Sequence, residues 1–150
     1  MIIAMYISNK RGEKQTAVSK VDVVAGCGIV GDRNFRKARW PGQNITFIES
    51  EEINNYNQNF AQDIPLGATH RNIITQGVRL NSLVGKEFNI GDVRFKGVEL
   101  CEPCSKMGKN LENHAMTKRE VVRAFVHKGG LRADILSDGK LAVGMEVIIT

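Results

Sequence analysis

Short strand-like segments follow one another so closely in this chain that they leave no room for repeated strand–helix–strand units. These segments lie at residues 1–7, 16–25, 44–49, 71–75, 87–90, 93–100, 131–136 and 145–149. The chain has 15 glycines but only three prolines, and glycine without proline is typical of tight turns between neighbouring strands. We therefore predict a mainly β fold with a few helices, arranged as an antiparallel barrel or sandwich.

Two segments between these strands have the spacing of amphipathic helices. The first is predicted over residues 50–62, with Ser50 as the N-cap and two glutamates in the first turn. The second is predicted over residues 117–128, where Thr117 and Glu120 have the capping-box spacing.

Length and composition restrict the class of protein. A chain of 150 residues has the size of one ordinary domain, so we predict a single domain over residues 1–150. No apolar run approaches the 18 or so residues of a membrane-spanning helix. The net charge of +5 suits an anionic ligand, but only 6% of the residues are aromatic, which argues against a nucleic-acid-binding surface. Three cysteines without a secretory signal predict reduced thiols and a cytoplasmic location.

The strongest chemical signal is a pair of cysteines, Cys101 and Cys104, in the sequence Cys-Glu-Pro-Cys. The pair follows the strand predicted at 93–100 and precedes a possible helix. A thiolate is both a nucleophile and a soft metal ligand, and nearby cations or a helix N-terminus lower the pKa of a thiol. Cys104 and Cys101 are therefore candidate catalytic residues, and we expect the pKa of Cys104 to be lowered if it is the reactive thiol.

The motif alone leaves several interpretations open. A dithiol oxidoreductase of the thioredoxin type would use both thiols, but that fold requires strand–helix–strand units. A zinc site needs two further ligands, for which Cys27 and His114 are candidates without the usual paired spacing. A single accessible thiol could carry sulfur or bind a metal, and two buried cysteines could simply pack as small hydrophobic residues.

Two other segments carry candidates for anion binding. The glycine-rich stretch with Gly31, Asp32 and Arg33 could present backbone N–H groups to an anion, although it lacks the lysine and hydroxyl residue of a P-loop. Arg71 and Asn72 begin a predicted strand, and an arginine there could bind phosphate or carboxylate through two parallel hydrogen bonds. A simple turn and a charge at a strand edge are the structural alternatives for these segments.

The order of these motifs resembles the MOSC domain family, the C-terminal module of molybdenum-cofactor sulfurases that also occurs as small free-standing bacterial proteins. The resemblance extends over about residues 23–148. It combines residues 28–33, 71–73, 77–91, 100–104, 129–130, 139 and 143–144. It implies a MOSC-type β-barrel, which agrees with the density of predicted strands.

The resemblance also implies a function for the cysteine. In this family a cysteine is thought to ligate molybdenum of a bound molybdopterin cofactor, or to carry sulfur as a persulfide, and Cys104 matches that position better because Pro103 precedes it. Related modules in larger proteins reduce N-hydroxylated compounds. The resemblance therefore implies a molybdenum-cofactor-dependent reductase or a sulfur-transfer protein. A non-catalytic cofactor-handling or adaptor module is the alternative. The predicted cofactor-binding residues are Gly31, Asp32, Arg33, Arg71 and Asn72.

Two departures from the family pattern affect these expectations. Family members often carry histidine soon after the Gly-Asp-Arg unit, but this chain has Asn34 and Phe35, which argues against a metal or proton role for that loop. No desulfurase segment is present, so we expect no pyridoxal phosphate in this chain and predict an external sulfur donor of the cysteine desulfurase type, or a redox partner. We also predict that Arg33, Arg71 and Cys104 converge on one concave site.

Overall fold

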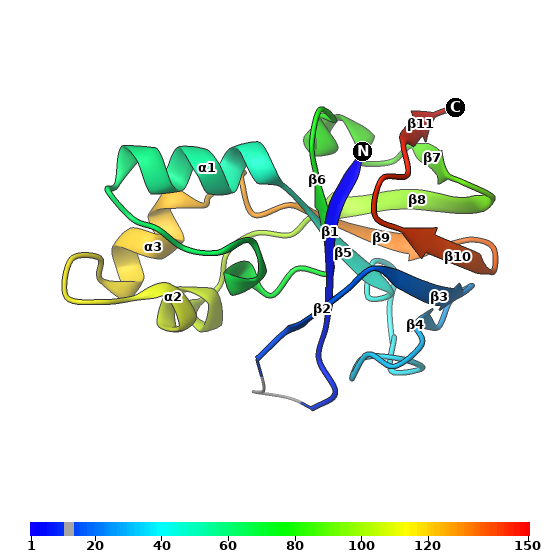
Figure 1. The fold of residues 1–150 in the computed structure, drawn as a ribbon, viewed down its shortest axis with the longest axis horizontal. Helices are drawn as coiled ribbons and strands as arrows, with labels where there is room; N and C mark the ends of the chain where they lie inside the picture. The colour runs from blue at the N-terminus through cyan, green and yellow to red at the C-terminus, as the bar shows by residue number, and fades with distance from the viewer. Residues whose placement is uncertain (11–13) are drawn as a thin grey trace.

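The computed structural model describes residues 1–10 and 14–150 and shows strands at one end of the molecule and helices at the other (Figure 1). The strands of the described residues are β1 (Ile2–Ile7), β2 (Thr16–Val18), β3 (Lys20–Val24), β4 (Gly28–Ile29), β5 (Ile45–Glu49), β6 (Ile73–Thr75), β7 (Glu87–Ile90), β8 (Val93–Leu100), β9 (Leu131–Ile135), β10 (Gly139–Ala142) and β11 (Val147–Ile149). The α-helices are α1 (Ser50–Asn59), α2 (Ser105–Leu111) and α3 (Lys118–Ala124), and the 3-10 helices are η1 (Leu66–Thr69) and η2 (Leu80–Leu83).

The strands form two sheets. The larger sheet has the order β11-β7-β8-β9-β5-β6-β1-β2, and the smaller sheet has the order β10-β3-β4. Within the described residues every strand pair is antiparallel except β5 with β6, which are connected through α1 and η1. The larger sheet curls as a half-barrel, and side chains from β3, β4 and β10 of the smaller sheet join its core. The predicted mainly β, barrel-like fold is therefore confirmed.

Strand β5 lies between two hydrophobic cores because successive side chains of a strand point to opposite faces. Phe47 points into the barrel, where its ring contacts Phe88 and Phe95 edge-on with centroids 5.7 Å away. Ile48 points to the other face, into the core beneath the helices, where Tyr56 and Phe125 stack at 4.7 Å. This double packing makes β5 a rigid support for the loops at its ends.

Several element boundaries differ from the sequence-based predictions. The strand predicted at 16–25 divides into β2 and β3, which belong to different sheets. Helix α1 ends at Asn59 rather than 62, because Ala61 turns the chain with a left-handed φ of 51°. Ser50 lies inside α1, and Glu49 occupies the N-cap position.

The capping box of α3 is confirmed, although the helix ends at Ala124 rather than 128. The Thr117 hydroxyl accepts a hydrogen bond from the Glu120 N–H, and the Glu120 carboxylate accepts one from the Thr117 N–H. After α3 the chain turns through His127, whose φ of 61° is left-handed. This turn leads into Gly129 and Gly130 and so brings the chain back to the sheet.

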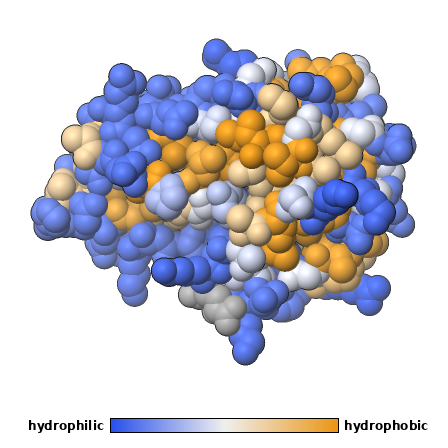
Figure 2. Space-filling view, viewed as in Figure 1, coloured by the Kyte–Doolittle hydropathy of each residue, from blue (hydrophilic) through white to orange (hydrophobic). Residues whose placement is uncertain are grey.

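The surface divides in the same way as the fold. Hydrophilic residues cover most of the helical end, whereas hydrophobic surface lies over the sheets and at the corner that β11 occupies (Figure 2). In the part of the chain that the structure describes, no helix has the length and apolar character needed to cross a membrane.

Candidate functional site

A pocket of about 330 Å³ opens between the β4–β5 segment, the η1–β6 segment and the start of α2. Five positively charged side chains line it: Arg33, Lys37, Arg71, Lys106 and Arg132. Among the described residues that line the pocket, Asp32 is the sole aspartate or glutamate. This excess of positive charge gives the pocket a potential that attracts anions.

The pocket brings together most of the predicted site residues. Arg33, Arg71 and Cys104 all line it, as the sequence analysis predicted, and so do Cys101, Asp32 and Asn72. Gly31 is not part of the pocket wall. Its φ of +90° is a left-handed backbone conformation that glycine adopts easily, so the structure gives Gly31 a role in the turn that precedes the pocket.

Asp32 and Asn72 hold the walls of the pocket. The Asp32 carboxylate accepts hydrogen bonds from the N–H groups of Ser8 (3.0 Å) and Asn34 (3.3 Å). The Asn72 side chain, 7% exposed, accepts from the Thr46 N–H at 3.2 Å and donates to the Tyr6 carbonyl at 3.2 Å. Both side chains therefore have structural roles, and Arg33 and Arg71 are the predicted cofactor-binding residues that bring positive charge to the pocket.

The Arg71 side chain connects separate backbone segments of the pocket through hydrogen bonds. Its Nε donates to the Gly129 carbonyl at 2.8 Å, and its Nη2 donates to the Cys101 carbonyl at 3.2 Å. A third bond runs from Nη1 to the Thr69 carbonyl at 3.5 Å. A guanidinium has five N–H groups, so two remain unused.

The charge of Arg71 has no carboxylate partner within residues 1–10 and 14–150. Partial burial of the guanidinium lowers its pKa, because it removes part of the water that hydrates the charge. A cation that has lost part of its hydration is stabilised when an anion lies nearby. In this pocket that anion can be the Cys104 thiolate, a bound ligand, or both.

Cys104 presents an exposed thiol at the N-cap of α2, whereas Cys101 is buried at 1% exposure. Partial burial of the Cys104 sulfur opposes ionisation, but four groups outweigh it and lower the pKa of this thiol. They are the backbone N–H groups of Met107 and Lys106 and the charges of Arg71 and Lys106. Of the two predicted catalytic cysteines, Cys104 is thus the one with the exposure and charge of a reactive thiolate.

The loop that carries the two cysteines is anchored on both sides. The Cys101 N–H donates to the Gly130 carbonyl at 2.7 Å, and the Cys101 carbonyl accepts the hydrogen bond from Arg71 Nη2. Between the cysteines, the Glu102 carboxylate accepts a hydrogen bond from the His127 N–H at 2.8 Å and lies 3.3 Å from its Nδ1. These contacts fix the position at which Cys104 begins α2.

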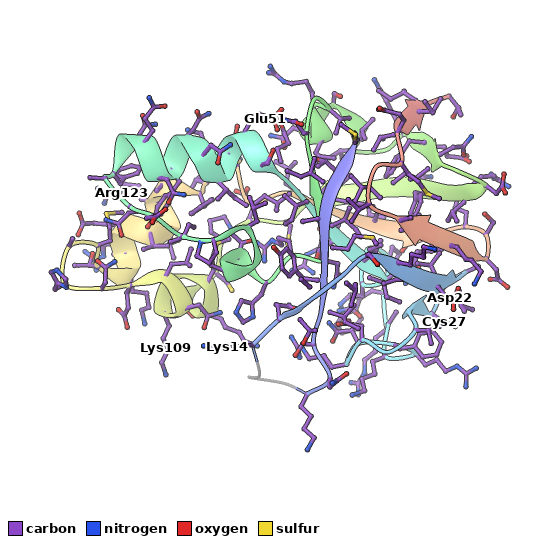
Figure 3. The ribbon with its side chains drawn as sticks, viewed as in Figure 1. Lys14, Asp22, Cys27, Glu51, Lys109 and Arg123 are labelled. Atoms are coloured by element: carbon purple, nitrogen blue, oxygen red, sulfur yellow. The ribbon has the colours of Figure 1, made fainter. Side chains whose placement is uncertain are left out.

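The residues proposed for a zinc site are not brought to the pocket. Neither Cys27 nor His114 lines it. Figure 3 shows Cys27 beside β3 and β4, at the opposite side of the view from Lys109 of α2. Across the described residues, no three His, Cys, Asp or Glu side chains gather in a metal-binding arrangement. A metal at Cys104 would therefore depend on ligands that come with a cofactor.

The pocket also contains residues that the sequence analysis did not select. His70, Thr69, Gln15 and Arg132 line it, and they come from three separate places in the chain. The side-chain amide of Gln15 donates to the His70 carbonyl at 3.2 Å and so connects the β1–β2 hairpin to η1. The only sequence signal for His70 and Thr69 was that they lie within two residues of Arg71.

Alkylation should distinguish the three cysteines. Slightly below neutral pH, iodoacetamide is expected to label Cys104 well before Cys27 and Cys101, because a thiolate with a lowered pKa is still populated there. Since the folded state lowers this pKa, the labelling rate of Cys104 should reach half its maximum at a lower pH than in the urea-unfolded chain. Pulse labelling with mass-spectrometric counting of each site measures both. Equally slow labelling of all three cysteines would contradict the prediction.

The fold and the site together define the class of protein. The MOSC domain family model matches residues 34–148, and the chain belongs to this family. No curated relative matches the sequence. The fold excludes a thioredoxin-like arrangement around the two cysteines, because the described residues contain a single parallel strand pair.

Solved structures share the fold over almost the whole chain. The YuaD protein of Bacillus subtilis aligns with a TM-score of 0.82 at 18% identity, over 98% of this chain and 94% of that one. YiiM of Geobacillus stearothermophilus aligns with a TM-score of 0.79 at 15% identity, over 100% of this chain and 74% of that one. YiiM of Escherichia coli gives 0.70 at 14% identity, over 99% and 69% respectively.

Proposed function

We propose that this MOSC-domain protein binds the molybdenum cofactor in the pocket, with the Cys104 thiolate as the protein ligand of the metal. The observation that carries this proposal is the exposed Cys104 thiol, whose pKa is lowered, beside the half-buried Arg71, which has no carboxylate partner within the described residues. A thiolate is a soft ligand suited to such a metal, and a phosphate-bearing pterin requires cationic partners. The pocket residues therefore fit the group in both charge and donor type.

Different residues of this chain would bind the metal, bind the anionic parts of the cofactor and support the pocket walls. Cys104 would hold the metal, while Arg33, Arg71 and Lys106 would hold the anionic parts of the cofactor. Asp32 and Asn72 would keep the walls in place through their backbone hydrogen bonds. When bound, the cofactor supplies two-electron redox chemistry, and reduction of N-hydroxylated compounds is the reaction that we propose. The electrons would come from a separate redox partner.

A sulfur-carrier role is the second candidate, and the exposure of Cys104 favours it. The Cys104 thiolate would attack the outer sulfur of a persulfide on a donor protein, of the cysteine desulfurase type. The sulfur would then remain on Cys104 as a persulfide, and the donor would leave as a thiolate. This step requires an accessible thiol and does not require Cys101.

The experiment is to purify the protein from a host that makes molybdopterin, and to test the preparation in two ways. After denaturation, the released pterin is oxidised and its fluorescence is measured against the protein concentration. The folded protein is assayed for reduction of benzamidoxime with reduced methyl viologen as electron donor. The proposal predicts near-equimolar pterin and turnover of the substrate. Absence of pterin would contradict cofactor binding, and pterin without turnover would favour the carrier or cofactor-handling role.

A further inference from the structure

We propose that His70 and Arg71 form a subsite for one tetrahedral oxyanion beside Cys104. The proposal rests on the proposed function in one respect, because the same pocket would take the phosphate-bearing cofactor. It adds a residue, His70, and a defined ligand chemistry that can be tested without any metal.

The backbone of His70 is held in an unusual conformation. His70 ends η1 with φ 60° and ψ 24°, a left-handed geometry that is uncommon for residues other than glycine. Its N–H donates to the Gly67 carbonyl at 3.2 Å, and its carbonyl accepts from Gln15. Strained backbone of this kind is concentrated at functional sites, where surrounding contacts maintain it.

The imidazole of His70 is available to a ligand. The ring lies half-buried on the pocket wall, and no hydrogen bond within residues 1–10 and 14–150 uses either ring nitrogen. Burial lowers the pKa of His70, and three cations lower it further: Lys106 from α2, Arg33 from the β4–β5 segment, and Arg71 from the adjacent position. Near neutral pH the ring is therefore uncharged and still provides one N–H donor.

The neighbours of His70 add further unused donors. Arg71 retains two N–H groups after its three bonds to carbonyls. Thr69 also lines the pocket, and its buried hydroxyl has no hydrogen-bond partner within the described residues. A buried polar group without a partner lowers stability, so a ligand that completes these bonds gains affinity. A phosphate-like oxyanion matches these donors because it has several acceptor oxygens. It also provides the negatively charged partner that Arg71 does not have among the described residues.

The anion should change the protonation of His70. A bound anion favours the imidazolium form, so it should raise the lowered pKa of His70 back toward or above the ordinary range. By linkage, the affinity for the anion should increase as the pH falls through the pKa of His70 in the complex. Protonation of the Cys104 thiolate, which also lines the pocket, would change the affinity in the same direction, so the pKa of the His70 ring itself is the quantity that assigns the effect to His70.

The test uses cofactor-free protein and inorganic phosphate at constant ionic strength. The chain has only three histidines, so the ring signals of His70, His114 and His127 can be followed separately by NMR. We expect a saturable shift confined to His70, and a higher pKa of His70 in phosphate than in chloride. No saturable shift, or equal shifts of all three histidines, would overturn the proposal.

Variants separate the subsite from general attraction by positive charge. His70→Asn keeps a residue that tolerates the left-handed backbone and is expected to weaken phosphate binding about tenfold in calorimetry. Lys109→Gln removes an exposed charge of α2 outside the pocket and serves as the control (Figure 3), with affinity changed by less than about twofold. Equal weakening in both variants would overturn the proposal. Arg71→Lys keeps the charge but loses the planar fork, and it should weaken binding further if the variant folds.

Two further arms identify the source of the anion and separate this proposal from the cofactor proposal. If the subsite holds the phosphate of a larger cofactor, glycerol 3-phosphate should bind about as well as inorganic phosphate. If it holds a free oxyanion, inorganic phosphate and molybdate should bind and the monoester should not. Phosphate binding without pterin in the preparation from the molybdopterin-producing host would sustain the subsite and contradict the proposed function. Pterin in that preparation without phosphate binding to the cofactor-free protein would sustain the proposed function and overturn the subsite.

Discussion

Replacing Gly130 by alanine is expected to lower the free energy of unfolding by at least about 3 kcal/mol, or to prevent folding. Gly130 has a φ of +106°, and a Cβ at this position would overlap the carbonyl oxygen of Phe47 and lie 3.2 Å from the Cα of Ile48. Neither residue can move easily, because β5 is packed on both faces. The same change would also disturb the Gly130 carbonyl that accepts from Cys101.

Gly144→Ala is the matched control for this prediction. Gly144 has a similar φ of +97°, but apart from its two chain neighbours no atom of the described residues lies within 4 Å of the position of its added Cβ. In the control only backbone strain remains, which should lower the free energy of unfolding by about 1 kcal/mol. The difference in free energy of unfolding between the two variants therefore measures the cost of the overlap with β5. Urea denaturation of both variants, followed by circular dichroism, gives this difference. Similar losses in the two variants would show that β5 accommodates the extra atom.

Much of the fold could be predicted because local signals agreed with the tertiary structure. Short strands around glycines and the capping box of Thr117 and Glu120 indicate their elements directly. Strand β10 was missed because Asp138 and Gly139 have the composition of a turn, whereas Gly139 in fact begins the strand and pairs with Val23. The pairing depends on contacts with a distant segment, which a local pattern does not contain.

The candidate site could be predicted in part. The resemblance to a family selected Cys104, Arg33 and Arg71, and the pocket contains all three. Sequence alone does not show which polar groups already have partners, so Asn72 was selected although its side chain bonds to the backbone of β1 and β5. His70 was missed because its importance comes from the cations of other elements and from its backbone conformation.

Cys104→Ser is expected to abolish retention of molybdenum, whereas Cys101→Ser is expected to keep it. Serine at position 104 preserves size and suits the N-cap of α2, but its hydroxyl is a hard donor that stays protonated near neutral pH. Cys101 is buried at 1% exposure and lacks the exposure that a metal ligand in the pocket requires. Cys101→Ser places a hydroxyl in the core and should reduce stability without removing the ligand.

The most direct test of this account is the molybdenum content of the unaltered protein, Cys101→Ser and Cys104→Ser, purified in parallel from a host competent in molybdopterin synthesis. Elemental analysis for molybdenum and zinc is compared with the protein concentration, after circular dichroism has shown that each variant is folded. We expect near-equimolar molybdenum in the first two proteins, only background in Cys104→Ser, and no stoichiometric zinc. Equal molybdenum in Cys104→Ser and the unaltered protein, or its loss only in Cys101→Ser, would contradict the assignment of Cys104 as the metal ligand.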